Sequence, residues 1–94
     1  MITCTIELYG LSAELAGISE VILELPEKNA GMQELIRALK KRLPELDGII
    51  FKKDEYVLAD DQAFNINGQF YSGSDVIMVH DGDRIRLLTA AIGG

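Results

Sequence analysis

Hydrophobic and polar residues alternate at the start of the chain. The even positions are apolar: Ile2, Cys4, Ile6 and Leu8. A period of two is typical of a strand with one buried face, so the pattern predicts a strand over 2–8. The same alternation predicts a second strand over 20–25, which Pro26 ends. The short connection favours an antiparallel hairpin, with 11–17 forming a loop or a short helical turn.

A different spacing follows, in which apolar residues recur every three or four positions. They are Met32, Leu35, Ile36, Leu39 and Leu43. This spacing places one apolar stripe on a helix, which we expect to cover the sheet. Asn29 is the expected N-cap, and Pro44 restricts the residue before it and so ends the helix. The basic trio Lys40, Lys41 and Arg42 complements the helix dipole as a solvated helix end, and a docking role for it is the alternative.

The second half of the chain begins with an irregular stretch over 45–63. Within it, 49–51 and 56–58 each predict either a short strand or a buried loop. A strand then runs into Asn67-Gly68, a dipeptide that tolerates the positive φ angles of a type I′ turn. This pair predicts a hairpin or a tight turn. After this turn, we expect the rest of the chain to form further strands.

A closing strand is predicted after the turn residues 81–83. Ile85 and Leu87 alternate with polar residues and should point into the core, and this strand should pair beside the first one. The order of elements is therefore strand, strand, helix, irregular middle and strands, which indicates an α+β fold with one main helix across a mixed sheet.

Composition narrows the classes of function. Ninety-four residues make one domain, and a hydrophobic fraction of 48% supports a core. The net charge of −6 argues against a nucleic-acid or anionic-membrane partner and favours a basic-faced protein partner. The amino-terminal residues carry no basic segment, and apolar runs fall short of the roughly 20 residues that span a bilayer, so we expect a cytoplasmic protein.

Candidate chemistry among the side chains is sparse. One cysteine and one histidine exclude an internal disulfide and leave no zinc constellation, so no metal site is expected. Cys4 belongs to the buried face of the first strand, and the alternative of a reactive thiol would need a basic neighbour. His80 is interpreted as a turn residue rather than a catalyst, because no motif surrounds it.

The last residues are therefore the most informative. The chain ends in Gly93-Gly94, whose lack of side chains would let a tail enter a narrow slot on another protein. We expect a folded domain over 1–88 and a flexible tail over 89–94, with the α-carboxylate of Gly94 as the working group. A frayed end without function is the alternative.

The outward residues of the closing strand form a candidate partner-binding set. Alternation places Arg84, Arg86 and Leu88 on the face opposite the core, just before the tail. In the functional interpretation, Leu88 and Ile92 are apolar anchors and Arg86 selects an acidic patch on the partner. In the alternative, a scattered surface leucine lies beside two solvated arginines.

Taken together, the elements resemble those of the MoaD/ThiS sulfur-carrier family. The resemblance is carried by the early hairpin, the helix that ends in Leu-Pro-Glu-Leu at 43–46, the turns at 67–68 and 81–83, and the terminal pair Gly93-Gly94. It covers nearly the whole chain except 52–63. The resemblance implies the ubiquitin-like β-grasp fold.

The resemblance also implies a function. In that family, an adenylyltransferase related to ubiquitin-activating enzymes uses ATP to adenylate the terminal carboxylate, and a sulfur donor such as a desulfurase or a rhodanese then leaves a thiocarboxylate. Gly94, next to Gly93, would be the carrier, and the domain itself would bind no cofactor. Such a chain is a protein co-substrate or a non-catalytic small subunit rather than an independent enzyme.

The pathway stays open at this stage. The length and the Leu-Pro-Glu-Leu helix end resemble the molybdopterin branch, in which the carrier is the small subunit of molybdopterin synthase and inserts its tail into the large subunit. Thr89-Ala90 stands where that branch commonly has two prolines. Carriers for thiamine or tRNA thiolation are therefore alternatives. So are a ubiquitin-like modifier that forms isopeptide bonds and a β-grasp interaction domain with idle glycines.

Overall fold

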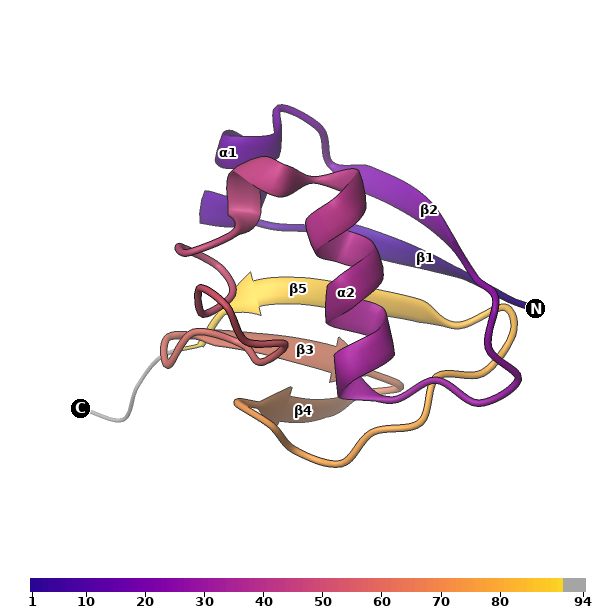
Figure 1. The fold of residues 1–94 in the computed structure, drawn as a ribbon. Coiled ribbons are helices and arrows are strands. Elements are labelled where there is room, and N and C mark those ends of the chain that lie inside the picture. The colour runs from indigo at the N-terminus through magenta and orange to yellow at the C-terminus, as the bar shows by residue number, and fades with distance from the viewer. Residues whose placement is uncertain (91–94) are drawn as a thin grey trace.

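The computed structural model describes residues 1–90, which form a five-stranded mixed sheet with helices on one face (Figure 1). The strands are β1 (Ile2–Leu8), β2 (Glu20–Leu25), β3 (Gln62–Ile66), β4 (Gln69–Ser72) and β5 (Arg84–Thr89). The helical segments are α1 (Leu11–Ala16), α2 (Met32–Arg42) and the short 3₁₀ helix η1 (Pro44–Leu46). The predicted α+β arrangement, with one main helix across a mixed sheet, is confirmed.

The first and last strands of the described chain lie side by side in the middle of the sheet. The strand order is β2-β1-β5-β3-β4, in which β1 is antiparallel to β2 and parallel to β5. Ile6 lies beside Ile85, and Leu8 lies beside Leu87. The predicted hairpin and the predicted pairing of the first and closing strands are both confirmed, and β5 is held between two strands.

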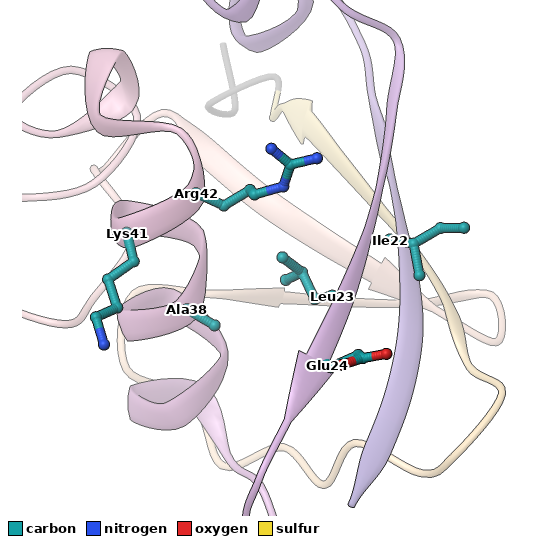
Figure 2. A pocket seen from close by; sticks show the side chains of 6 residues that line it. All are labelled: Ile22, Leu23, Glu24, Ala38, Lys41 and Arg42. Carbon is teal, nitrogen blue, oxygen red and sulfur yellow. The ribbon is translucent and has the colours of Figure 1, made fainter.

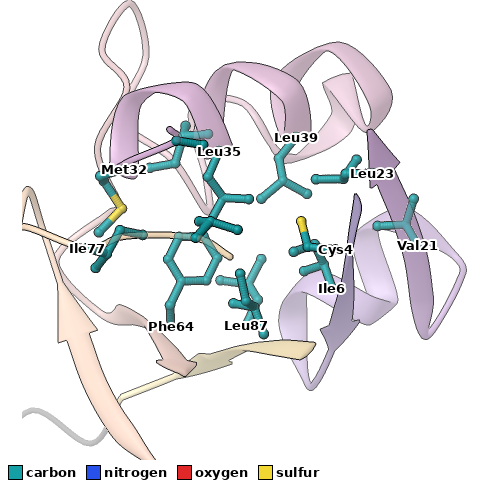
Figure 3. Packing of buried hydrophobic residues seen from close by; sticks show 14 of the residues in the cluster. Cys4, Ile6, Val21, Leu23, Met32, Leu35, Leu39, Phe64, Ile77 and Leu87 are labelled. Atoms are coloured by element: carbon teal, nitrogen blue, oxygen red, sulfur yellow. The ribbon is translucent and has the colours of Figure 1, made fainter. Parts of the chain in front are cut away.

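Helix α2 buries its apolar stripe against this sheet. All five predicted stripe residues are buried, and Figure 3 shows Leu35 and Leu39 over Cys4, Phe64 and Leu87. The expected N-cap was wrong, because Gly31 rather than Asn29 caps the helix. The backbone N–H of Gly31 donates to Glu34 Oε1 at 2.7 Å, so a carboxylate in the first turn satisfies the helix entry.

The basic trio at the end of α2 divides into two roles. Lys40 is half-buried and donates from Nζ to the carbonyl oxygens of Lys52 and Glu55 at 2.9 and 2.6 Å, and it pairs with Asp47 at 3.0 Å. Lys40 therefore anchors the irregular segment, whose structure the sequence pattern did not predict. Lys41 and Arg42 stay exposed.

That irregular segment is a buried loop rather than a pair of strands. Ile50, Phe51 and Leu58 are fully buried, and isolated bridges join Phe51 to Asp47 and to Leu58 without extending into a ladder. Of the two alternatives left open for 49–51 and 56–58, the structure shows the loop.

Two turns fix the strands around β5. Asn67 and Gly68 have φ angles of 53° and 85°, which agree with the type I′ turn expected between β3 and β4. At the other turn, Asp81 Oδ1 accepts from the N–H of Thr3 at 2.8 Å, so the entry to β5 is tied to β1. His80 lies exposed beside this turn, as expected.

Candidate functional site

The face of the sheet opposite α2 carries three of the four residues predicted to bind a partner: Arg84, Arg86 and Leu88. Alternation and register place these side chains on it, and we call this set the open face: Thr5, Glu7, Ile22, Asn65, Phe70, Arg84, Arg86 and Leu88. Figure 1 shows α2 lying across the other side of the sheet. Arg84 and Arg86 are exposed, whereas Ile85 and Leu87 are fully buried, so the predicted inward and outward sides of β5 are confirmed.

Glu7 is the hub of a charged network on the open face. Arg84 donates to Glu7 Oε2 from Nη2 at 2.6 Å and from Nε at 2.9 Å, and Arg86 Nε lies 3.3 Å from Oε1. The Tyr9 hydroxyl also donates to Oε1, at 2.9 Å. Arg84 extends the network to Glu20 Oε2 at 3.0 Å. The Glu7 carboxylate therefore fixes the positions of both arginine side chains. Glu7 was not among the residues predicted from the sequence.

These contacts set the ionisation of the network. The hydrogen bond from Arg84, followed by the one from Tyr9, lowers the pKa of Glu7. The same bonds raise the pKa of Arg84 and, through the carboxylate acceptor, raise the pKa of Tyr9. At neutral pH the hub is therefore an ionised carboxylate between two cations. Arg84 contacts two carboxylates, at 2.6 and 3.0 Å, whereas Arg86 contacts only Glu7, at 3.3 Å, so Arg86 has fewer carboxylate contacts than Arg84.

Strand β3 supplies a small groove beside Arg86. Asn65 lies opposite Arg86 in the register, and Asn67, Gly68, Glu7 and Arg84 complete a depression of about 270 Å³. Polar atoms line much of this depression. It suits a carboxylate or an amide from a partner better than an apolar side chain.

Leu88 and Phe70 add apolar surface to the open face. Leu88 is half-buried and lies beside Ala63, and Phe70 lies opposite Asn65 with 65% of its surface exposed. Phe70 was not predicted from the sequence, because β4 has only four residues. The signal was present, since a two-residue turn at Asn67-Gly68 fixes the pairing of the positions on either side of it.

The carboxyl end of β5 is fastened to the sheet. The side-chain amide of Gln62 donates to Thr89 Oγ1 at 3.2 Å, and the N–H of Ala90 donates to the carbonyl of Asp61 at 2.8 Å. Two residues of the predicted tail over 89–94 thus lie against β3. Ile92, Gly93 and Gly94 lie outside the described residues, so the tail and its working group stay predictions.

Cys4 is part of the core, as expected. Its side chain lies under α2 in Figure 3, and 1% of the residue is exposed. Burial, with a smaller contribution from the negative charge of Asp83, raises the pKa of Cys4 to about 11. The thiol is therefore protonated at neutral pH and out of reach of a second protein.

Residues 1–90 contain neither a membrane-spanning helix nor a cluster of metal-binding side chains. No helix in that range is long and apolar enough to cross a membrane. The same described range holds no group of three or more His, Cys, Asp or Glu side chains arranged to hold a metal ion.

The fold is shared with known structures over almost its full length. SAMP1 from Haloferax volcanii superposes with a TM-score of 0.76 at 24% identity, covering 98% of this chain and 99% of that chain. The small archaeal modifier protein 1 of Methanosarcina acetivorans gives 0.72 at 24% identity, covering 100% and 98%. A protein of Pyrococcus furiosus assigned as molybdopterin converting factor, subunit 1, gives 0.68 at 24% identity, covering 97% and 100%. The chain therefore has the ubiquitin-like β-grasp fold.

Comparison at the level of sequence identifies the family. No curated protein matches the chain. The model of the ThiS family, however, matches residues 6–94, which is almost the whole chain and includes the final glycine pair. The chain belongs to the ThiS family.

Proposed function

We propose that the chain is a sulfur carrier whose Gly94 α-carboxylate is converted to a thiocarboxylate. The observation that carries this proposal is the family match, which runs from strand β1 through Gly93-Gly94. The proposal takes Gly94 as the last residue of the working protein. An activating enzyme and a sulfur donor are then required partners.

The chemistry of the side chains supports a carboxylate as the carrier. A protein can hold transferable sulfur on a cysteine or on an activated carboxyl group. The single cysteine, Cys4, is buried and its pKa is raised to about 11, so it is a poor acceptor. An α-carboxylate on Gly94, in contrast, would belong to a residue without a side chain.

Activation must come from outside the chain. An α-carboxylate has a pKa of about 3.3 to 3.7 and is a poor electrophile when ionised at neutral pH. The partner enzyme would use ATP to form the acyl adenylate with release of pyrophosphate, and a sulfur nucleophile would then displace AMP. The chain's own contribution is to present the carboxylate and to dock.

The geometry of β5 supports a division between docking and delivery. Ala90 is held by Asp61, so the four residues beyond it can extend at most about 14 Å. A partner must therefore bring its active site close to this end of the sheet. We propose that it does so by contacting Arg86 and Leu88 on the open face, with Ile92 as a further anchor.

Within this class, we favour the small subunit of a molybdopterin synthase. Two observations support it: the Leu-Pro-Glu-Leu segment at 43–46, which follows α2, and the likeness to the Pyrococcus furiosus subunit. The large subunit would then receive the tail. A carrier for thiamine synthesis or for tRNA thiolation uses the same carboxylate chemistry and differs only in its acceptor.

A ubiquitin-like protein modifier is the second candidate. Two of the structural relatives bear the name small archaeal modifier protein, and this likeness favours the candidate at the level of fold. In a modifier, the activated Gly94 would form an isopeptide bond with a lysine of a target protein. Activation is common to both candidates, and the product separates them.

Intact mass of the protein recovered from its native host tests the proposal. A species in which one oxygen is replaced by sulfur is expected, and a Gly94 deletion serves as the control that lacks it. Conjugates of higher mass without the sulfur species would favour the modifier. Neither species under sulfur-replete conditions, or a chain that continues past Gly94, would contradict the proposal.

A further inference from the structure

Strand β2 is an edge of the sheet and lies next to helix α2. The strand order ends at β2, and β1 is its partner on one side. A strand edge presents N–H and C=O groups that can pair with an added strand, and proteins commonly protect such edges. The backbone groups and side chains along β2 therefore determine which segment can pair with this edge.

The register identifies the free backbone groups. Leu8 donates to the carbonyl of Ser19 at 2.8 Å, and the antiparallel register pairs Ile6 with Val21 and Cys4 with Leu23. Backbone bonding alternates along an antiparallel strand, so the odd-numbered residues of β2 bond to β1. The N–H and C=O groups of Glu20, Ile22 and Glu24 consequently point away from the sheet, along its edge.

A groove runs beside these groups, between β2 and α2. We call it the edge groove, and Figure 2 shows its lining residues: Ile22, Leu23, Glu24, Ala38, Lys41 and Arg42. It is a shallow depression of about 470 Å³ that is open to solvent. The small side chain of Ala38 leaves room between helix and strand, and the Arg42 side chain reaches from α2 toward β2. The groove thus has an apolar floor and a basic end.

The two basic residues of the groove are Lys41 and Arg42, and both are exposed. Lys40 is engaged with the 47–55 segment, but Lys41 and Arg42 form no ion pair with any side chain in residues 1–90. They stand on a protein whose net charge is −6. A local cationic end in an otherwise acidic chain favours an acidic group on whatever binds there.

The outward face of β2 limits where that acidic group can be. Glu20 and Glu24 lie on that face, on either side of Ile22, which is 61% exposed. In an added strand, side chains alternate between the two faces. Acidic side chains are therefore repelled on the Glu20 face and attracted on the Arg42 face, while an apolar side chain suits the position beside Ile22.

We propose that the edge groove binds an extended segment of a partner protein, which adds as a sixth strand to β2. The segment carries apolar β-branched residues beside Leu23 and Ile22 and an acidic residue next to Arg42. Backbone pairing with Glu20, Ile22 and Glu24 supplies affinity, and the basic end of α2 selects the register. Arg84, Arg86 and Leu88 do not line this groove, although Ile22 belongs both to the groove and to the open face.

The test uses the full chain and a synthetic peptide. A capped peptide of four valine or isoleucine residues followed by aspartate, threonine and aspartate, which places both carboxylates on one face of the strand, is titrated to about 1 mM, the weakest affinity of interest. Backbone amide NMR signals should shift along β2 and the last turn of α2. The amides of Ile22 and Glu24 should also exchange more slowly with solvent, because they become hydrogen bonded.

Methylated peptides test the pairing without changing the protein. Alternate amides of an added strand face β2, so two peptides are made, each methylated at one alternating set. One set should abolish binding, and the other should leave it within about twofold, since only one set donates to the edge. Equal loss with both peptides, or with neither, would overturn strand addition.

Charge reversal tests the basic end. Arg42→Glu should weaken peptide binding about tenfold or more, the change that corresponds to about 1.4 kcal/mol. Lys53→Glu is the matched control, because it makes the same change at an exposed residue outside the groove, and it should leave the affinity nearly unchanged. If both variants weakened binding equally, the effect would come from the change in net charge alone. That result would overturn the assignment of Arg42.

Two other outcomes would also contradict the proposal. Peptide-induced shifts confined to Arg86 and Phe70 would place binding on the open face instead. A concentration-dependent dimer, seen by sedimentation and abolished by Arg42→Glu, would show that a second copy of the chain occupies the edge.

Discussion

The two faces of strand β5 are built from alternating residues of one short segment, yet they are held in different ways. The inward residues Ile85 and Leu87 are fully buried beneath α2. The outward residues Arg84 and Arg86 are exposed and are positioned by hydrogen bonds to Glu7. Packing fixes one face, whereas a charged network that water can reach fixes the other.

The difference shows which changes should alter stability and which should alter recognition. Burial of an apolar side chain contributes about 1.5–3 kcal/mol, whereas an exposed ion pair contributes about 0–1 kcal/mol. The outward arginines are therefore poorly explained as stabilising groups. Their placement just before the proposed carrier residues makes recognition the better explanation.

The largest expected effect concerns the tail, which belongs to neither face. Deleting Gly94 should abolish activation, because it removes the carboxylate at its proper reach, and the melting temperature should stay nearly unchanged. ATP–pyrophosphate exchange with the cognate activating enzyme measures the first effect, and thermal melting measures the second. Normal exchange after the deletion would exclude Gly94 as the activated residue.

The next effect tests the inward face. Leu87→Ala should reduce the free energy of unfolding by about 2–5 kcal/mol, since it removes a fully buried side chain and leaves a cavity under α2. Urea denaturation measures the loss. Its matched partner is Leu88→Ala, one residue along and half-buried, which should lose much less. A larger loss for Leu88→Ala would show that the two sides of β5 have been assigned in reverse.

A smaller effect tests the outward face. Arg86→Glu and Leu88→Ala should each weaken binding to the activating enzyme or to a large subunit by about 1 kcal/mol or more, a threshold typical of contacts that matter at an interface. Calorimetric titration measures this, and Lys53→Glu is a control for net charge. Unchanged affinity for both variants would remove the open face from the interface.

The fold was predictable where short-range patterns and core packing agree. Three patterns fix local structure and also place apolar residues in one core. They are the alternation in 2–8 and 20–25, the apolar stripe on α2 and the turn at Asn67-Gly68. The loop over 47–58 lacked such agreement. Its buried residues Phe51 and Leu58 pack into the core, and Lys40 bonds to the loop backbone. Contacts between residues far apart in the sequence leave no periodic pattern of apolar residues, so they could not be predicted.

The candidate site was predictable only in part, for a related reason. Arg84, Arg86 and Leu88 follow from the alternation of one strand. Glu7 is 77 residues from Arg84 in the sequence, and the pairing of β1 with β5 is what brings them together. The helix cap shows the same limit, because the Glu34 side chain made Gly31 a better cap than Asn29.

The smallest expected effect concerns Glu7. Its ion pairs should make the free energy of unfolding depend on pH. The unfolded chain should have the ordinary pKa of a glutamate at Glu7, and the hydrogen bond from Arg84 lowers the folded pKa below it. The folded state therefore binds this proton less readily than the unfolded state. The stabilisation is complete above the unfolded pKa and disappears as the pH falls through the folded pKa.

Glu7→Gln isolates this contribution. The variant keeps the shape of the side chain but cannot ionise, so it should be slightly less stable than the parent at about pH 7 and equally stable below the folded pKa. Urea denaturation of both proteins at several pH values measures the difference, which added salt should shrink because the side chains of both arginines are more than half exposed. A gap between the two proteins that stays constant down to about pH 3 would show that Glu7 acts through packing rather than through charge. In that case the open face would resemble the inward face, and the contrast between them would rest on Arg86 and Leu88 alone.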